Sequence, residues 1–115
     1  MNREKVAAEL VKLAKGLISV SEHAEDVASA VSSVLKLRSR PKFNQKWDET
    51  EIVFDSPMKG VEKVVVAFSP DSENVSVGIY PVGNALFFED AQDRDVVKAA
   101  KKAARKALRE LKRIS

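Results

Sequence analysis

Residues 61–80 have the sequence VEKVVVAFSPDSENVSVGIY, in which two apolar segments flank a turn. The first segment, residues 61–69, is mostly apolar, which is typical of a strand near the centre of a sheet. The second, residues 75–79, alternates valine and isoleucine with serine and glycine, as a strand with one buried face does. Residues 70–74 between them contain proline, aspartate, serine and asparagine, which favour turns. The segment therefore predicts an antiparallel hairpin.

More strands are expected on both sides of this hairpin. Residues 42–47 and 50–55 each alternate polar with apolar or aromatic residues, and Asp48-Glu49 between them suits a tight turn. Downstream, residues 85–88 begin a last short strand after a break at Pro81-Val82-Gly83-Asn84. Connections this short favour an antiparallel meander, so we expect four or five strands between residues 41 and 89.

The N-terminal third has helical periodicity. Residues 3–18 carry apolar residues at three- and four-residue spacing, which predicts an amphipathic helix. Ser19 and Glu22 have the spacing of a capping box, which predicts a second helix over residues 22–37. One continuous, kinked helix is the alternative. The polar face of the second helix is mostly serine, a small residue that permits close approach of a partner: Ser29, Ser32 and Ser33.

The C-terminal segment predicts a strongly amphipathic helix over residues 93–114. Its apolar stripe contains Val97, Ala100, Ala104, Ala107, Leu108 and Leu111. Glu89, Asp90 and Asp93 are expected at its N-terminal end, where carboxylates satisfy open amides and the positive end of the helix dipole. Alanines in the stripe allow close packing on a sheet.

These elements predict a two-layer α+β fold in one domain, residues 1–115. The domain consists of a helical part (1–38), a four- or five-stranded antiparallel sheet (41–89) and a basic amphipathic helix (93–114) packed on the sheet. Aromatic Phe43 and Trp47 suit either a stacking pair for bases or the inward face of a strand, and we favour core packing.

Charge is distributed unevenly along the chain. The protein has a formal net charge of +3, but residues 1–38 carry +1, residues 39–94 carry −4 and residues 95–115 carry +6. Eight cations occupy most of one side of the last helix, and only Asp95 and Glu110 offer anions there. Like charges four residues apart repel each other by a few tenths of a kcal/mol per pair. Such uncompensated charge indicates a surface that binds nucleic acid or the acidic surface of another protein. The candidate binding residues are Lys98, Lys101, Lys102, Arg105, Lys106, Arg109, Lys112 and Arg113.

Composition excludes several chemistries. The chain has no cysteine and one histidine, which removes thiolate and histidine-built metal sites and thiol nucleophiles, so no metal or cofactor is expected. A zero cysteine count fits the cytoplasm, and no signal peptide or membrane span is expected. We interpret His23 as a surface residue and the clustered carboxylates as turn, cap and solvent-facing groups, so we do not expect an enzyme. Those carboxylates are Asp48, Glu49, Glu51, Asp55, Glu89, Asp90, Asp93 and Asp95.

Two resemblances accompany these patterns. The last helix resembles a helix of double-stranded-RNA-binding domains, whose Ala-x-x-x-Ala-Ala-x-x-Ala-Leu pattern is matched by Ala99, Ala103-Ala104 and Ala107-Leu108. No binding residue is carried over, because Val96-Val97 stands where that family has a lysine pair. Residues 3–15 are similar to the first helix of many short phage-encoded proteins, which implies a phage or accessory origin and no activity.

The sequence therefore favours a non-catalytic binding module that contacts nucleic acid or another polyanion through its last helix. The alternative is a structural or assembly protein, phage-encoded in origin, that self-associates or docks on another protein. The small-residue face of the second helix and an uncovered sheet face motivate this alternative. The acidic region of one copy would then receive the basic helix of another.

Overall fold

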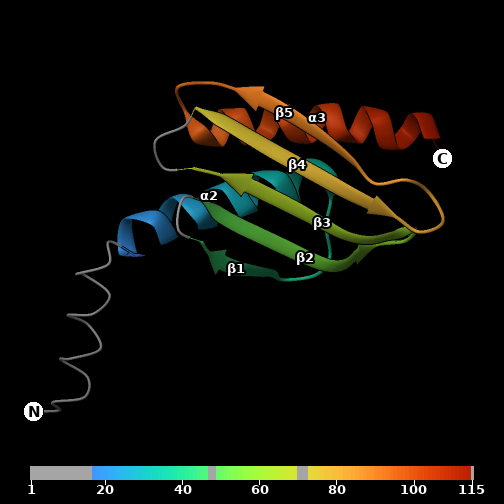
Figure 1. The fold of residues 1–115 in the computed structure, drawn as a ribbon, viewed down its shortest axis with the longest axis horizontal. Coiled ribbons are helices and arrows are strands. Elements are labelled where there is room, and N and C mark those ends of the chain that lie inside the picture. Colours follow the sequence, from blue (N-terminus) through green and yellow to red (C-terminus); the bar gives the residue numbers. More distant parts are fainter. Residues whose placement is uncertain (1–16, 47–48, 70–72, 115) are drawn as a thin grey trace, which may run out of the picture.

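The computed structural model describes residues 17–46, 49–69 and 73–114, the first six of them as backbone only. Two helices cover one face of a five-stranded antiparallel sheet whose spatial order, β1-β2-β3-β4-β5, is also the chain order (Figure 1). The predicted two-layer α+β fold is confirmed. Its elements are α2 (Leu17–Leu35), β1 (Pro41–Gln45), β2 (Thr50–Met58), β3 (Val61–Phe68), β4 (Asn74–Pro81), β5 (Phe87–Gln92) and α3 (Val96–Ile114).

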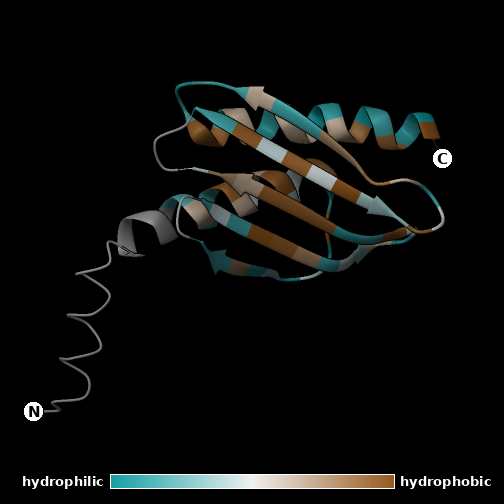
Figure 2. Ribbon diagram, viewed as in Figure 1, coloured by the Kyte–Doolittle hydropathy of each residue, from teal (hydrophilic) through white to brown (hydrophobic). Residues whose placement is uncertain are grey.

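The core lies between the sheet and the helices. Phe54 on β2 pairs with Val64 on β3, which pairs with Ile79 on β4, and all three side chains are fully buried. Neighbouring positions along each strand alternate between this inner face and the outer one, as strand geometry requires. Figure 2 shows apolar residues as a brown run along β3 and the middle of β2, the centre of the sheet. The predicted central hairpin, residues 61–80, thus forms the middle of the sheet.

Alanine allows α3 to pack closely on its neighbours. Five alanines of α3 are completely buried against β4, β5 and α2: Ala99, Ala100, Ala103, Ala104 and Ala107. The predicted stripe members Val97, Leu108 and Leu111 are only partly buried and pack at the margin of the core. The side of α3 that the core leaves uncovered carries the basic residues. The helix is therefore fixed in its orientation by small residues on one side and by charge on the other.

The course of α2 differs from the prediction. Over the described residues the helix runs without a break from Leu17 through residues 19–22, where a capping box was expected to start a new helix. The predicted break is therefore wrong. The predicted helix over residues 3–18 lies almost entirely outside the described part of the chain. The buried stripe of α2 contains Ala24, Val27, Ala28, Val31 and Leu35, and Ala30 is buried as well.

The last strand is longer than expected. β5 extends to Gln92, so Glu89 and Asp90 belong to the sheet and do not lie at the start of α3. The expectation that they flank the helix is wrong for these two residues. Asp95 caps α3 instead: its Oδ1 accepts hydrogen bonds from the amides of Val97 at 2.9 Å and Lys98 at 3.4 Å. One carboxylate therefore satisfies two of the open amides of the first turn.

The edge strand β1 is less covered than expected. Phe43 pairs with the buried Ile52 and so faces the helical side of the sheet, yet 48% of its surface is exposed. Its assignment to the core is therefore wrong, because α2 makes most of its close contacts with α3 and few with β2. Trp47, its proposed companion, lies outside the described residues.

Candidate nucleic-acid interface

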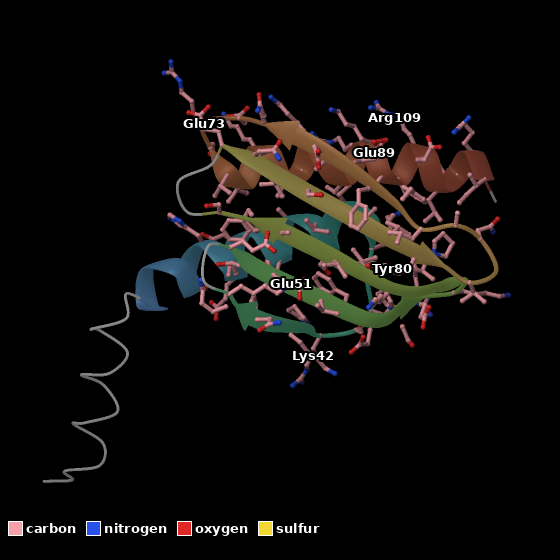
Figure 3. The ribbon with its side chains drawn as sticks, viewed as in Figure 1. Lys42, Glu51, Glu73, Tyr80, Glu89 and Arg109 are labelled. Atoms are coloured by element: carbon pink, nitrogen blue, oxygen red, sulfur yellow. The ribbon has the colours of Figure 1, made fainter. Side chains whose placement is uncertain are left out.

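The eight predicted cations all lie on α3 and are all exposed. At 100° per residue they fall within an arc of about 140°, and the buried alanines occupy the opposite side. A helix of 19 residues extends about 28 Å, so the charges follow most of one long edge of the molecule. We call this arc, Lys98, Lys101, Lys102, Arg105, Lys106, Arg109, Lys112 and Arg113, the cationic face. Figure 3 labels Arg109 at this edge.

Two members of the cationic face form ion pairs with carboxylates. The Lys102 ammonium lies 2.8 Å from Oδ2 of Asp93, in the connection between β5 and α3. Arg113 pairs with Glu110, one turn before it on the same helix. Both cations remain more than half exposed, so solvent screens these pairs. They neutralise Lys102 and Arg113 and leave the other members of the cationic face unaffected.

The ion pairs shift the proton equilibria in the expected directions. The hydrogen bond from Lys102 lowers the pKa of Asp93, and the backbone amide of Asp95, which donates to the same carboxylate at 3.0 Å, lowers it further. The hydrogen bond to Glu110 raises the pKa of Arg113. Asp93 is thus held as an anion, which keeps the ammonium of Lys102 next to the connection that precedes α3.

A third member of the cationic face contacts the main chain. The ammonium of Lys106 donates a hydrogen bond of 2.7 Å to the carbonyl of Asp90 on β5. The bond connects α3 with the edge strand next to it. It leaves the positive charge of Lys106 unneutralised, because a carbonyl carries only a partial charge.

Three members of the cationic face, four residues apart along α3, have no carboxylate partner in the part of the chain that the structure describes. Within the described ranges, no carboxylate lies within 4.0 Å of Lys101, Arg105 or Arg109. Lys98 influences Asp93 through space, and Lys112 has a contact of its own, so we restrict the argument to the first three. Their separations of four residues place like charges on neighbouring turns.

A shallow groove runs beside these residues. It has a volume of about 270 Å³ and lies between α3 and the outer edge of β5. Its lining consists of Ala91, Gln92, Lys102, Arg105, Lys106 and Arg109. Four positively charged side chains thus surround one depression, and a phosphate group seated there would meet donors from two successive helical turns.

A larger hollow of about 880 Å³ lies between α2 and the start of α3. Its lining mixes both signs of charge: His23 and Asp26 from α2, Arg94 and Asp95 from the connection, and Lys101 from α3. Over residues 17–46, 49–69 and 73–114, no three histidine, aspartate or glutamate side chains converge to hold a metal ion. Neither of the two described helices combines the length and the apolar character that a membrane span requires.

Sequence reasoning identified the cations but not everything around them. Because the sheet was expected to end at residue 89, the contributions of Ala91 and Gln92 to the groove were missed, and so was the bond from Lys106 to Asp90. The alternation of β5 was the available indication: Phe87, Glu89 and Ala91 continue the inner face.

Comparison of this chain with protein-family models, with curated proteins and with solved structures gives no match. The resemblances to double-stranded-RNA-binding domains and to short phage proteins stay predictions.

Proposed function

We propose that this protein is a non-catalytic binding module that contacts the phosphate backbone of nucleic acid through the cationic face of α3. The observation that carries the proposal is a row of three exposed cations on that face, Lys101, Arg105 and Arg109, which have no carboxylate partner within the described residues. Helix repulsion at these positions costs stability, and a bound polyanion compensates it.

The chemistry of the cationic face favours weak sequence preference. Every side chain in it is a lysine or an arginine, and phosphate contacts from these residues position a protein without specifying a sequence. The amide side chains that read adenine are absent from α3. The groove beside β5 supplies the site where one phosphate is held by several donors.

Fluorescence anisotropy with a labelled 20-base-pair DNA duplex of mixed sequence tests the proposal, with duplex and single-stranded RNA in parallel. The Kd is measured between 50 and 400 mM NaCl. Replacing Lys101, Arg105 and Arg109 together with glutamine should weaken binding strongly and reduce the slope of log K against log salt by roughly 2.7, since each lost phosphate contact contributes about 0.9.

A matched variant controls for net charge. Arg38, Arg40 and Lys59 are exposed cations outside α3, and replacing them with glutamine removes the same three charges. The control should bind nearly as the parent does. Absent or salt-insensitive binding by the parent, or an equal loss in both triple variants, would overturn the proposal.

Assembly is the competing function. It predicts a stable closed oligomer, seen by light scattering, with no affinity for nucleic acid at low salt, and the anisotropy assay therefore distinguishes the two. Our proposal includes a cytoplasmic location, which the cysteine-free sequence supports because a reducing compartment neither requires nor maintains disulfides.

A further inference from the structure

Among the described residues, no strand pairs with the outer edge of β1, which leaves its main-chain groups for another strand. The amide of Lys46 donates to the carbonyl of Glu49 at 2.8 Å, which closes the β1–β2 hairpin with a hydrogen-bonded pair. Pairs in an antiparallel ladder alternate, so Asn44 and Lys42 also bond to β2. It follows that the amides of Phe43 and Gln45 point away from β2.

The part of the chain that the structure describes leaves a groove beneath that edge. It has a volume of about 530 Å³ and lies between β1 and α2. Phe43, Phe54 and Ala28 provide apolar lining, and serines of α2, of which Ser29 and Ser33 are exposed, form one wall. A half-exposed phenylalanine beside an open strand edge is a recognised hazard for association, which most edge strands avoid by covering or charge.

The opposite edge of the sheet is better protected. On β5, the ammonium of Lys106 occupies the carbonyl of Asp90, and α3 lies alongside. On β1, Lys42 is turned to the outer face of the sheet, where it pairs with Asp55 at 2.8 Å. Figure 3 shows Lys42 and Arg109 at opposite edges of the molecule. Association through β1 therefore leaves the cationic face exposed.

We propose that two copies of this chain associate through β1, forming one continuous ten-stranded antiparallel sheet about a two-fold axis at Phe43. In this register Phe43 faces Phe43 of the second copy, and the two residues exchange two main-chain hydrogen bonds. Each Gln45 amide donates to the carbonyl of Pro41 in the other copy, which adds two more. Pro41 has no amide to donate, so its place at the end of the strand removes only one bond per copy.

The side chains suit this register. Lys42 lies opposite Asn44 of the second copy, so no like charges face each other within β1. Just outside the strand, Arg40 lies opposite Lys46 of the second copy, and Lys46 is already paired with Glu51 of its own chain at 3.2 Å. The two Phe43 rings lie on the helical side of the sheet, next to both grooves, and cover each other's exposed surface. The inference is independent of nucleic-acid binding, because none of these residues belongs to the cationic face.

Cysteine crosslinking provides a sharp test, because the natural chain contains no cysteine. In the full-length Phe43→Cys variant the two sulfurs would stand across the two-fold axis, with Cα atoms about 5.5 Å apart, and mild oxidation should give a covalent dimer. Lys42→Cys and Phe88→Cys are the controls. In Lys42→Cys the two cysteines do not face each other, because residue 42 of one copy lies opposite residue 44 of the other. In Phe88→Cys they lie on the far edge strands. Both should stay uncrosslinked.

Sedimentation equilibrium of the unmodified chain, without nucleic acid and in 0.5 M NaCl, measures the association itself. Phe43→Pro removes an amide that β2 does not use, so circular dichroism should show the fold intact while dimerisation weakens at least tenfold. A monomer at all concentrations would overturn the inference. A dimer that persists in Phe43→Pro, or that crosslinks through Phe88→Cys, would also overturn it. So would a monomer with residues 1–16 of its own chain in the groove.

Discussion

The phenyl ring of Phe88 occupies the space in which a β-carbon on Gly78 would stand. The two residues are register partners on β5 and β4, on the face of the sheet that no described helix covers. The ring also meets Tyr80 edge-on, with centroids 6.4 Å apart and planes at 84°. Lys63 lies 4.5 Å above the Tyr80 ring. Glycine in the strand therefore admits an aromatic side chain that would otherwise stand fully in solvent.

This relationship predicts that the stability change caused by Gly78→Ala reverses its sign when Phe88 is removed, which a double-mutant cycle measures. Gly78→Ala alone should destabilise the protein by about 1–3 kcal/mol, because the new methyl group displaces the Phe88 ring. In a Phe88→Ala background the same substitution should stabilise by about 0.5–1 kcal/mol, since alanine suits a strand better than glycine. Urea denaturation of the four proteins measures the coupling. Equal effects of Gly78→Ala in both backgrounds would contradict the packing described.

The Asp93–Lys102 pair predicts acid sensitivity at the start of α3. Because the folded-state pKa of Asp93 is lowered from its ordinary 3.8, its contribution to stability is present above that value and disappears as the pH falls through the lowered one. Carbon-detected NMR titration of the carboxyl group should give a midpoint below 3.8. In Lys102→Met the midpoint should rise, while Lys59→Met should leave it unchanged. An Asp93 midpoint that ignores Lys102→Met would refute the pair.

Charge repulsion along α3 predicts a trade between stability and binding. Arg105→Glu converts two repulsive i,i+4 pairs, with Lys101 and Arg109, into attractive ones and should stabilise the fold by about 1 kcal/mol. The same substitution should weaken nucleic-acid binding markedly. The stability gain should vanish in 1 M NaCl, where the screening length is about 3 Å. A destabilised variant at low salt would mean that the repulsion is already relieved within the chain.

The alanines of α3 predict intolerance of larger side chains. Ala103 is completely buried, and Ala103→Leu should cost about 1–3 kcal/mol because the helix cannot move away from the sheet without losing its other contacts. Lys98→Leu places the same side chain on the exposed side of the same helix and should change stability by less than about 0.5 kcal/mol. Thermal unfolding of both variants checks the contrast.

Much of the fold follows from short-range patterns in the sequence. The hairpin at residues 61–80 and the last helix are predictable because each element buries one side. Burial of one side leaves a regular pattern of apolar residues in the sequence. The end of β5 was misplaced because Glu89 and Asp90 lie on an edge strand, where polar residues resemble a helix N-terminus. Ser19 and Glu22 do not mark the start of a second helix, because residues three apart with this chemistry also occur inside helices.

The candidate site is predictable in its residues and less so in its surroundings. Exposure of the cations follows from helix periodicity alone. The pairing of Lys102 with Asp93 does not, because Asp93 precedes the helix and reaches Lys102 only through the course of the β5–α3 connection. The half-exposure of Phe43 is equally invisible in the sequence, since it depends on how closely α2 approaches α3 rather than β1.

Every strand of the sheet pairs with its neighbour in the chain, whereas α2 and α3 meet across the whole length of the meander. Pairing of neighbouring strands therefore closes only short loops of chain, whereas the contact between α2 and α3 closes a long one. We expect the hairpins to be formed in the folding transition state and the helix contact to close afterwards. Mutations at Val64 or Val77 should then slow refolding, and mutations at Ala30 should mainly accelerate unfolding.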